Sequence, residues 1–182
     1  MIMRKTAGFL KVIYTIGLVL EIIAAVVCAG LEIFFLVIGN LSDLAEKAGG
    51  VITITGGNLT PAELDAFKPV MMAAIGIAIL GLILAILGTV KTRKALGEIK
   101  EERPFSDTAA KSIKAAANLG IAGGVIGVIG AIVLAVMAKD LTVNGTSVSS
   151  STISLNLTFI IDAVQKYMFY YVAKYGQTLE RR

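Results

Sequence analysis

Residues 70–89, VMMAAIGIAILGLILAILGT, decide the fold of this chain because they carry no charged side chain over their whole length. A helix needs about 20 consecutive apolar residues to cross the hydrocarbon core of a bilayer. The alternative is a soluble protein with buried helices, but 56% hydrophobic and 16% charged residues are typical of a membrane protein. We therefore expect residues 1–182 to form a single polytopic membrane domain.

Three further apolar stretches resemble the first and predict an all-α bundle of four transmembrane helices. The predicted segments are the spans 12–38, 69–90, 113–138 and 155–173, the external loop 39–68, the cytoplasmic loop 91–112, the external hairpin loop 139–154 and the cytoplasmic tail 174–182.

Basic residues gather in the N-terminal tail, in the 91–112 loop and in the C-terminal tail, whereas the other two loops carry mainly carboxylates. The positive-inside rule then places both termini in the cytoplasm. The excess of positive charge lies where anionic lipid headgroups would meet it, so the bilayer itself is the expected partner. We expect no direct nucleic-acid binding, because glutamates interrupt the basic residues and no aromatic side chains alternate with them.

Cysteine and histidine usage excludes several reaction classes. One cysteine and no histidine cannot make a disulfide relay, a His-based triad, a haem site or an ordinary zinc site. The carboxylates are isolated and lack a spaced nucleophile, base or metal-ligand set. We therefore expect no catalytic residue, no cofactor and no metal site, and we predict that the protein is not an enzyme.

The two external loops carry strand and turn signals. Residues 51–55 alternate apolar and polar side chains between two glycine pairs, and Asn144-Gly145 stands between two short strand-like runs. We expect a small extracytoplasmic β-sheet built from both loops. Residues 60–63, Thr-Pro-Ala-Glu, predict a capped helix start just before the second span.

Small residues recur at spacings of three and four along the second and third spans. Helices in lipid associate by close backbone approach, which such residues allow. The pattern predicts an internal helical hairpin, and a homo-oligomer interface is the alternative. The predicted packing seam comprises Gly81, Gly88, Gly120, Gly123, Gly127 and Gly130.

Charged side chains inside the first and fourth spans are costly unless they are paired or hydrated. At 1.5 Å per residue, Glu21, Asp162 and Lys166 are expected at similar depths. Such a cluster is a polar lock between the spans, the cation or proton site of a small transporter or channel, or the wall of a hydrated cavity or partner surface. Its predicted members are Glu21, Glu32, Asp162, Gln165 and Lys166.

The cytoplasmic loop contains a predicted corner. Pro104 ends the preceding helix, Ser106 or Asp107 caps the next one, and Phe105 is expected to plug the inner end of the bundle.

Two short motifs carry a family resemblance. Residues 97–107, GEIKEERPFSD, resemble the G-x-P-F-S linker of the bacterial four-span family known as domain-of-unknown-function family 2975. Residues 172–180, VAKYGQTLE, resemble the motif that closes that family, an aromatic or basic residue followed by Gly-x-x-Leu. The resemblance covers nearly the whole chain in span order, although six residues, Glu-Ile-Lys-Glu-Glu-Arg, separate Gly97 from Pro104 here.

The resemblance implies a bacterial cytoplasmic (inner) membrane protein of unassigned activity, often encoded beside a small helix-turn-helix regulator. It therefore predicts a non-enzymatic structural, sensory or regulatory partner. The basic 91–103 segment is the expected docking surface for such a regulator.

Overall fold

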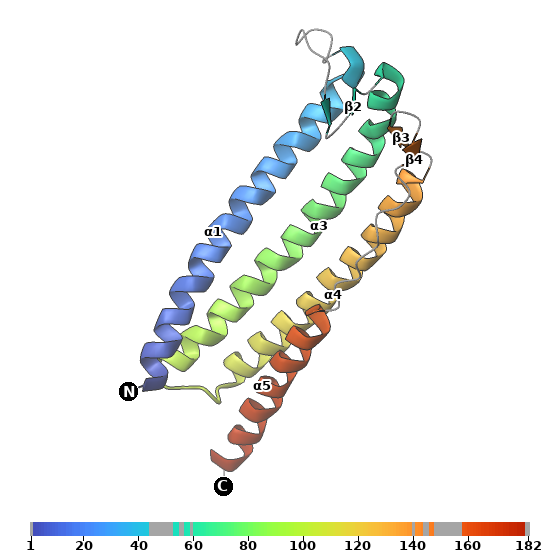
Figure 1. The fold of residues 1–182 in the computed structure, drawn as a ribbon. Coiled ribbons are helices and arrows are strands. Elements are labelled where there is room, and N and C mark those ends of the chain that lie inside the picture. The colour runs from blue at the N-terminus through green and yellow to red at the C-terminus, as the bar shows by residue number, and fades with distance from the viewer. Residues whose placement is uncertain are drawn as a thin grey trace. The chain divides into compact units, whose positions relative to one another are not determined.

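The computed structural model describes residues 2–43, 53–54, 57–58, 60–139, 141–143, 146–147 and 158–180. Helices dominate the described chain (Figure 1). They are α1 (Ile2–Val37), α3 (Pro61–Lys100), α4 (Asp107–Ala138) and α5 (Thr158–Glu180).

The predicted fold class is wrong in its number of spans. Within the described residues three helices are long and apolar enough to cross a membrane, Arg4–Val37, Pro61–Lys100 and Asp107–Ala138. Helix α5 is not among them. Its 23 residues include Asp162, Gln165 and Lys166, and these polar side chains oppose insertion into hydrocarbon.

The predicted sheet joining the two loops is also wrong. Strand β1 (Thr53–Ile54) pairs antiparallel with β2 (Gly57–Asn58), and β3 (Thr142–Val143) pairs antiparallel with β4 (Thr146–Ser147). These are two separate two-residue ladders, and no described strand of one loop pairs with the other loop. Closing a short local turn costs less chain entropy than joining distant loops. Residues 144–145, where the hairpin turn is predicted, lie outside the described residues.

The start of α3 follows the sequence prediction. The Thr60 N–H donates to Glu63 Oε2 at 2.8 Å, and the Glu63 N–H donates to Thr60 Oγ1 at 3.3 Å. Pro61 occupies the first helical position, where its missing N–H leaves no hydrogen bond unmade. The predicted capping box is confirmed.

The chain divides into two compact units. Unit 1 contains Met1–Ala25, Leu80–Ile126 and Asn156–Arg182, and unit 2 contains Val26–Ile79 and Gly127–Leu155. Helices α1, α3 and α4 therefore contribute to both units, whereas α5 belongs to unit 1 alone.

Unit 2 contains a small buried cluster of Phe35, Leu41 and Leu64, against which Met72 and Ile75 pack. The start of α3 is held to the chain that follows α1 by a polar contact. Asp65 accepts hydrogen bonds from the Ser42 N–H at 3.0 Å and from the Ser42 hydroxyl at 2.7 Å. Hydrogen bonds to a charged carboxylate are stronger than those between neutral groups, so this is a strong contact between two segments that are distant in sequence.

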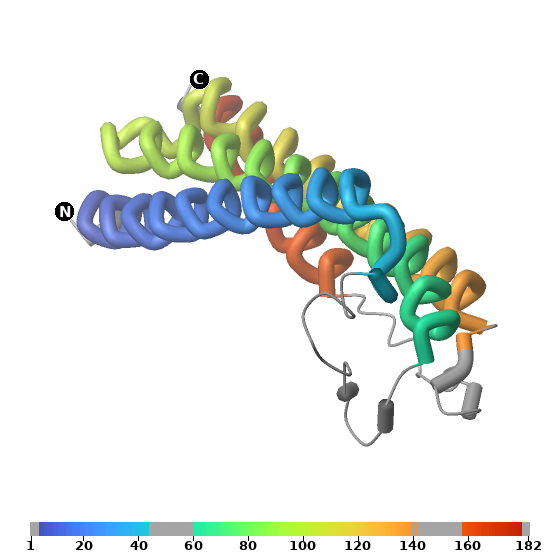
Figure 2. Tube along the Cα trace, turned by 90° about the horizontal axis from the view of Figure 1, so that it is seen from above, coloured from blue at the N-terminus to red at the C-terminus, as the bar shows by residue number. Residues whose placement is uncertain are grey.

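In unit 1, α1 lies along α3 (Figures 1 and 2), and the Thr89 hydroxyl of α3 donates a 3.0 Å hydrogen bond to Glu21 of α1. Helix α5 runs antiparallel to α4. Phe159 near its start contacts Gly124 of α4, and Gly176 near its end contacts Phe105, which precedes α4.

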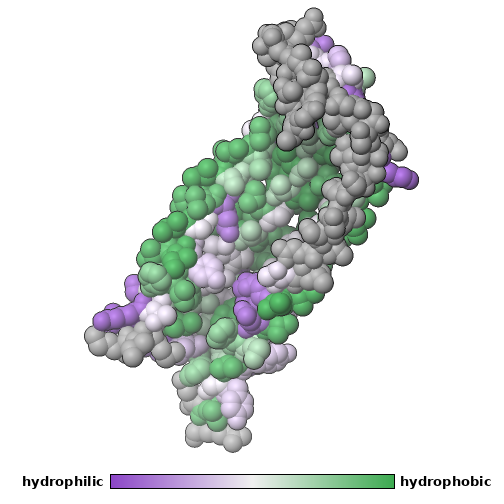
Figure 3. Space-filling view, viewed as in Figure 1, coloured by the Kyte–Doolittle hydropathy of each residue, from purple (hydrophilic) through white to green (hydrophobic). Residues whose placement is uncertain are grey.

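Large apolar side chains cover the outward faces of the long helices. On α1, Phe9 is 66% exposed, Val26 67% and Val37 80%. Figure 3 shows the same preference, because the visible face over the helices is mainly hydrophobic with few polar patches. Water would make such exposure costly, whereas lipid chains would solvate these side chains without that cost.

Candidate functional site

A groove of about 320 Å³ lies in unit 1 where α1, α3, α4 and α5 meet. We call it the α5 groove. Most of its lining is apolar, including Leu10 from α1, Leu96 and Ile99 from α3, Ile113 from α4 and Phe169 from α5. The polar lining residues are Tyr14, Thr92, Asp162, Gln165 and Lys166.

Helix α5 supplies the charged wall of this groove. Lys166 Nζ forms an ion pair with Asp162 Oδ2 one turn away, and the two side chains are 25% and 50% exposed. An acidic residue four positions before a basic one is the favourable order on a helix. The α4 backbone comes close at Gly120, where an added Cβ would lie 3.6 Å from Asp162 Oδ2. Gly120 therefore faces the ion pair of α5 at ordinary contact distance, although the sequence predicts it in the α3–α4 seam.

Glu21 makes a different contact from the predicted one. Its Oε1 accepts a hydrogen bond from the Thr89 hydroxyl of α3 at 3.0 Å, while its Oε2 is buried without a partner. The described contacts include no hydrogen bond or ion pair from Glu21 to Asp162 or Lys166. Thr89 was missed as a partner, although it is the one hydroxyl in an otherwise apolar stretch.

Glu32 belongs to unit 2, where its Oε2 is also buried without a partner. Of the predicted cluster, the structure thus brings Asp162, Gln165 and Lys166 together along one groove.

The predicted seam residues do not all meet the facing helix of the hairpin. At Gly88 and Gly123 an added Cβ would lie 3.8 Å from the Cβ atoms of Leu119 and Leu84, so each glycine meets a large side chain of the facing helix. At Gly130 in unit 2, an added Cβ would lie 2.5 Å from Ile77. Gly81 and Gly127 face open space, and Gly120 faces α5. The homo-oligomer alternative stays a prediction.

A Schellman motif closes α3 at the predicted corner. The Glu102 N–H donates to the Ile99 carbonyl at 3.1 Å, and the Arg103 N–H donates to the Glu98 carbonyl at 3.0 Å. Glu102 has a φ of 63°, the left-handed conformation that glycine usually supplies at this position. Pro104 follows directly, where it cannot continue the helix. Sequence reasoning missed the motif because the glycine that normally marks it is absent.

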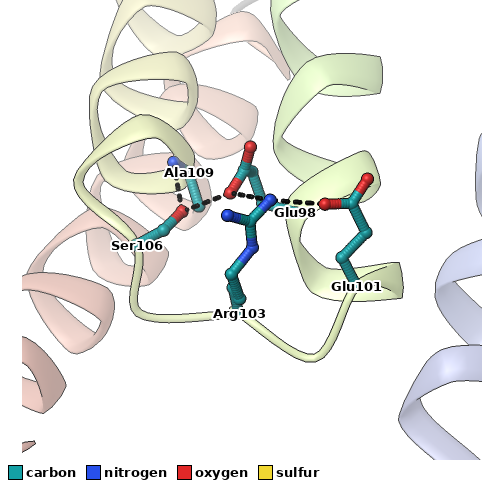
Figure 4. A network of polar contacts seen from close by, with 5 residues as sticks. All are labelled: Glu98, Glu101, Arg103, Ser106 and Ala109. Atoms are coloured by element: carbon teal, nitrogen blue, oxygen red, sulfur yellow. Dashed lines mark hydrogen bonds and ion pairs between the residues drawn. The ribbon is translucent and has the colours of Figure 1, made fainter.

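Ser106 caps α4, as predicted for that position. The Ala109 N–H donates to Ser106 Oγ at 3.1 Å, and the Ser106 hydroxyl donates to Glu98 Oε2 at 2.9 Å. Arg103 lies between two carboxylates and pairs with Glu98 and with Glu101 (Figure 4). The end of one helix and the start of the next therefore share one polar network.

Phe105 packs against Gly176 of α5. A Cβ added at Gly176 would lie 2.5–2.7 Å from ring atoms of Phe105, so the ring rests on the glycine backbone. Gly176 is buried. The two short motifs that carry the family resemblance are thus in direct contact, a relation that their separation in the sequence concealed.

Other contacts between α4 and α5 were also missed. The Tyr167 hydroxyl donates to Asn118 Oδ1. Lys114 Nζ of α4 lies 5.4 Å from the ring centroid of Tyr170, within cation–π range, and Lys174 Nζ of α5 itself lies 5.8 Å from the same centroid. An amide in an apolar helix, as at Asn118, is the signal that could have indicated a partner.

The described ranges contain no group of three or more His, Cys, Asp or Glu side chains that could hold a metal ion. The long apolar helices and their exposed apolar faces define a multi-pass helical membrane protein. No protein-family model matches the chain, and neither the curated proteins nor the solved structures include a match. The resemblance to domain-of-unknown-function family 2975 therefore rests on the linker and closing motifs.

Proposed function

We propose that this is a non-enzymatic sensory or regulatory membrane protein that binds a small amphiphile in the α5 groove. The observation that carries the proposal is an apolar groove with a charged wall, built from four helices. Ligand pockets typically measure about 300–1,000 Å³ and combine apolar lining with a few polar groups. The groove has both properties, at the lower end of that size range.

The wall indicates the chemistry of the ligand's polar group. Asp162 and Lys166 neutralise each other, so a ligand with a net charge gains little from the pair. Lys166 still has ammonium protons to donate and Asp162 still has carboxylate lone pairs to accept them. A zwitterionic or uncharged polar group attached to an aliphatic chain fits this arrangement best.

The same geometry favours this proposal over a transporter or channel. A cation or proton site would use the excess negative charge of two carboxylates beside one ammonium. Glu21 instead bonds to Thr89, which leaves the α5 pair electrically neutral.

We place the protein in a bacterial cytoplasmic membrane with the N-terminus and the basic 91–103 segment in the cytoplasm. The positive-inside rule supports this orientation. So does a contact in unit 1, where Lys11 of α1 lies beside Gly97 of α3. This contact puts the N-terminal part of α1 next to the basic segment. A cysteine introduced near the N-terminus should react with maleimides only after the cytoplasmic membrane is permeabilised.

The ligand proposal is tested by mass spectrometry of small molecules that co-purify with the full-length protein in mild detergent. Ile113→Trp fills the groove, and Ile161→Trp is its control on the exposed face of α5. We expect about a tenfold loss of a zwitterionic or uncharged amphiphile in the first variant only. Equal retention in both variants would contradict the proposal.

A second pair of variants tests the charged wall. Lys166→Met removes the ammonium from the groove, whereas Lys174→Met removes one from the same helix outside the groove lining. Only Lys166→Met should weaken retention. If both variants retained the amphiphile like the unaltered protein, the wall would have no part in recognition.

A cytosolic helix-turn-helix regulator is the partner that the family resemblance implies. The 91–103 segment supports this proposal by its positive charge. A purified regulator of this type should bind the unaltered protein and lose affinity when Lys91 and Lys94 are replaced by Gln. Replacement of Lys139, which lies outside the segment, should have no effect.

A further inference from the structure

A second groove lies at the linker end of unit 1, between the first turns of α1 and the last turns of α3. Its volume is about 440 Å³, and we call it the basic groove. The lining residues are Arg4, Lys11, Gly97, Lys100, Glu101 and Glu102. Unlike the α5 groove, it has no large apolar side chain in its lining.

The cations of this groove lack counter-ions within the described part of the chain. The ion pairs there involve Arg103, Lys111 and Lys166, and none involves Arg4, Lys11 or Lys100. The two carboxylates compensate only in part, because Glu101 is already engaged by Arg103. The groove therefore has a positive balance that an anion would reduce.

Gly97 has a specific place in this groove. A Cβ added there would lie 3.4 Å from Lys11 Nζ, so the ammonium sits against the bare backbone of α3. A Cβ alone would sit at contact distance, but the further atoms of a side chain as large as leucine would compete with the Lys11 ammonium for the groove. Gly97 is also the first residue of the linker motif. The hydrogen bonds that form the corner do not require a glycine at this position.

We propose that the basic groove binds the phosphate of an anionic phospholipid. An arginine and two lysines on facing helices can surround one phosphate, with arginine able to donate two parallel hydrogen bonds. Phe9 and Val12 of α1 are 66% and 57% exposed beside Lys11, and they offer apolar surface to the acyl chains. A soluble phosphate would make no use of that surface. The proposal is independent of the ligand of the α5 groove.

The test compares lipid retention by the full-length protein in nanodiscs made from equal parts of phosphatidylglycerol and phosphatidylcholine. After transfer to detergent, native mass spectrometry counts the lipids that remain bound. The test variant combines Arg4→Gln, Lys11→Gln and Lys100→Gln. Its control combines Lys91→Gln, Lys94→Gln and Lys174→Gln, which remove the same charge outside the groove.

We expect the control to retain phosphatidylglycerol like the unaltered protein. Each cation removed from the groove should weaken retention about fivefold, because a charged hydrogen-bond donor to the bound phosphate is lost. Equal losses in the test and control variants would show a general effect of surface charge and would overturn the proposal. So would release of the lipid by low-millimolar inorganic phosphate, because the groove would then prefer a free anion.

Gly97→Leu keeps the net charge and fills the groove, so it tests the site separately from charge. Phosphatidylglycerol retention should fall while phosphatidylcholine retention stays unchanged. Retention of both lipids at the unaltered level would overturn the proposal, because the lipid would then not occupy the groove. Ile113→Trp in the α5 groove should leave phosphatidylglycerol bound, which separates a failure here from a failure of the amphiphile proposal.

Discussion

Helices α3 and α5 differ in what keeps them in place. The 40 residues of α3 contain an apolar stretch that favours a membrane by itself, whatever its neighbours are. The 23 residues of α5 carry a polar stripe and depend on particular contacts with α4 and with the linker. Point substitutions should therefore lower the unfolding free energy when they alter the contact residues of α5. Substitutions on the exposed face of α3 should change it little.

The strongest test of this difference is Gly124→Ala, which places a Cβ 2.1–2.5 Å from the Phe159 ring. The ring cannot stay where it is, so α5 should separate from α4 with a loss of about 2–3 kcal/mol in unfolding free energy. Denaturant titration in detergent measures the loss, and limited proteolysis should show α5 cleaved first. Gly127→Ala is the control, because its Cβ meets open space and should stabilise the helix slightly. An equal loss in both variants would contradict the Phe159 contact.

Gly176→Ala tests the other end of α5. The new Cβ would lie 2.5–2.7 Å from Phe105, and we expect a loss of about 2 kcal/mol. Adding Phe105→Leu to Gly176→Ala should restore part of the loss, because the smaller side chain leaves space for the Cβ. If the double variant is no more stable than Gly176→Ala alone, the two motifs do not stabilise each other.

Thr89→Val tests the one hydroxyl side chain in the apolar stretch 70–89 of α3. It removes the donor that satisfies Glu21 Oε1 and should cost about 1 kcal/mol. Thermal unfolding followed by circular dichroism measures the change. Thr15→Val is the matched control, since the Thr15 hydroxyl bonds only to the Lys11 carbonyl of its own helix. A larger effect of the control would mean that the α1–α3 contact contributes little.

The smallest expected effect is at the end of α3, where Glu102→Gly should raise the unfolding free energy by about 1 kcal/mol. Glycine adopts the φ of 63° without the steric cost that a Cβ imposes. Glu102→Ala removes the same charge but keeps the Cβ, so it should give no such gain. Equal stabilisation by both substitutions would assign the effect to charge instead of backbone conformation.

The sequence predictions were confirmed where the structure depends on residues close together in the chain. Thr60 and Glu63 make the expected capping box, and Ser106 caps α4, because a cap depends on residues three positions apart. The predicted sheet failed because it required distant loops to pair, which local strand patterns do not encode. The cluster of Glu21 with the α5 charges was inferred from depth alone. Depth does not specify which neighbouring helix supplies the partner of Glu21. In the structure α3 supplies it, through the hydroxyl of Thr89.

By itself, the sequence determined that long apolar helices form and that their outward faces suit lipid, because hydropathy and length are properties of each segment alone. Only the tertiary structure decided that Phe159 packs on Gly124, that Phe105 rests on Gly176, and that Lys11 lies beside Gly97. The first two outcomes depend on which side chains approach a backbone closely enough to need a glycine there. Such an approach joins residues far apart in the chain, so no local sequence pattern predicts it.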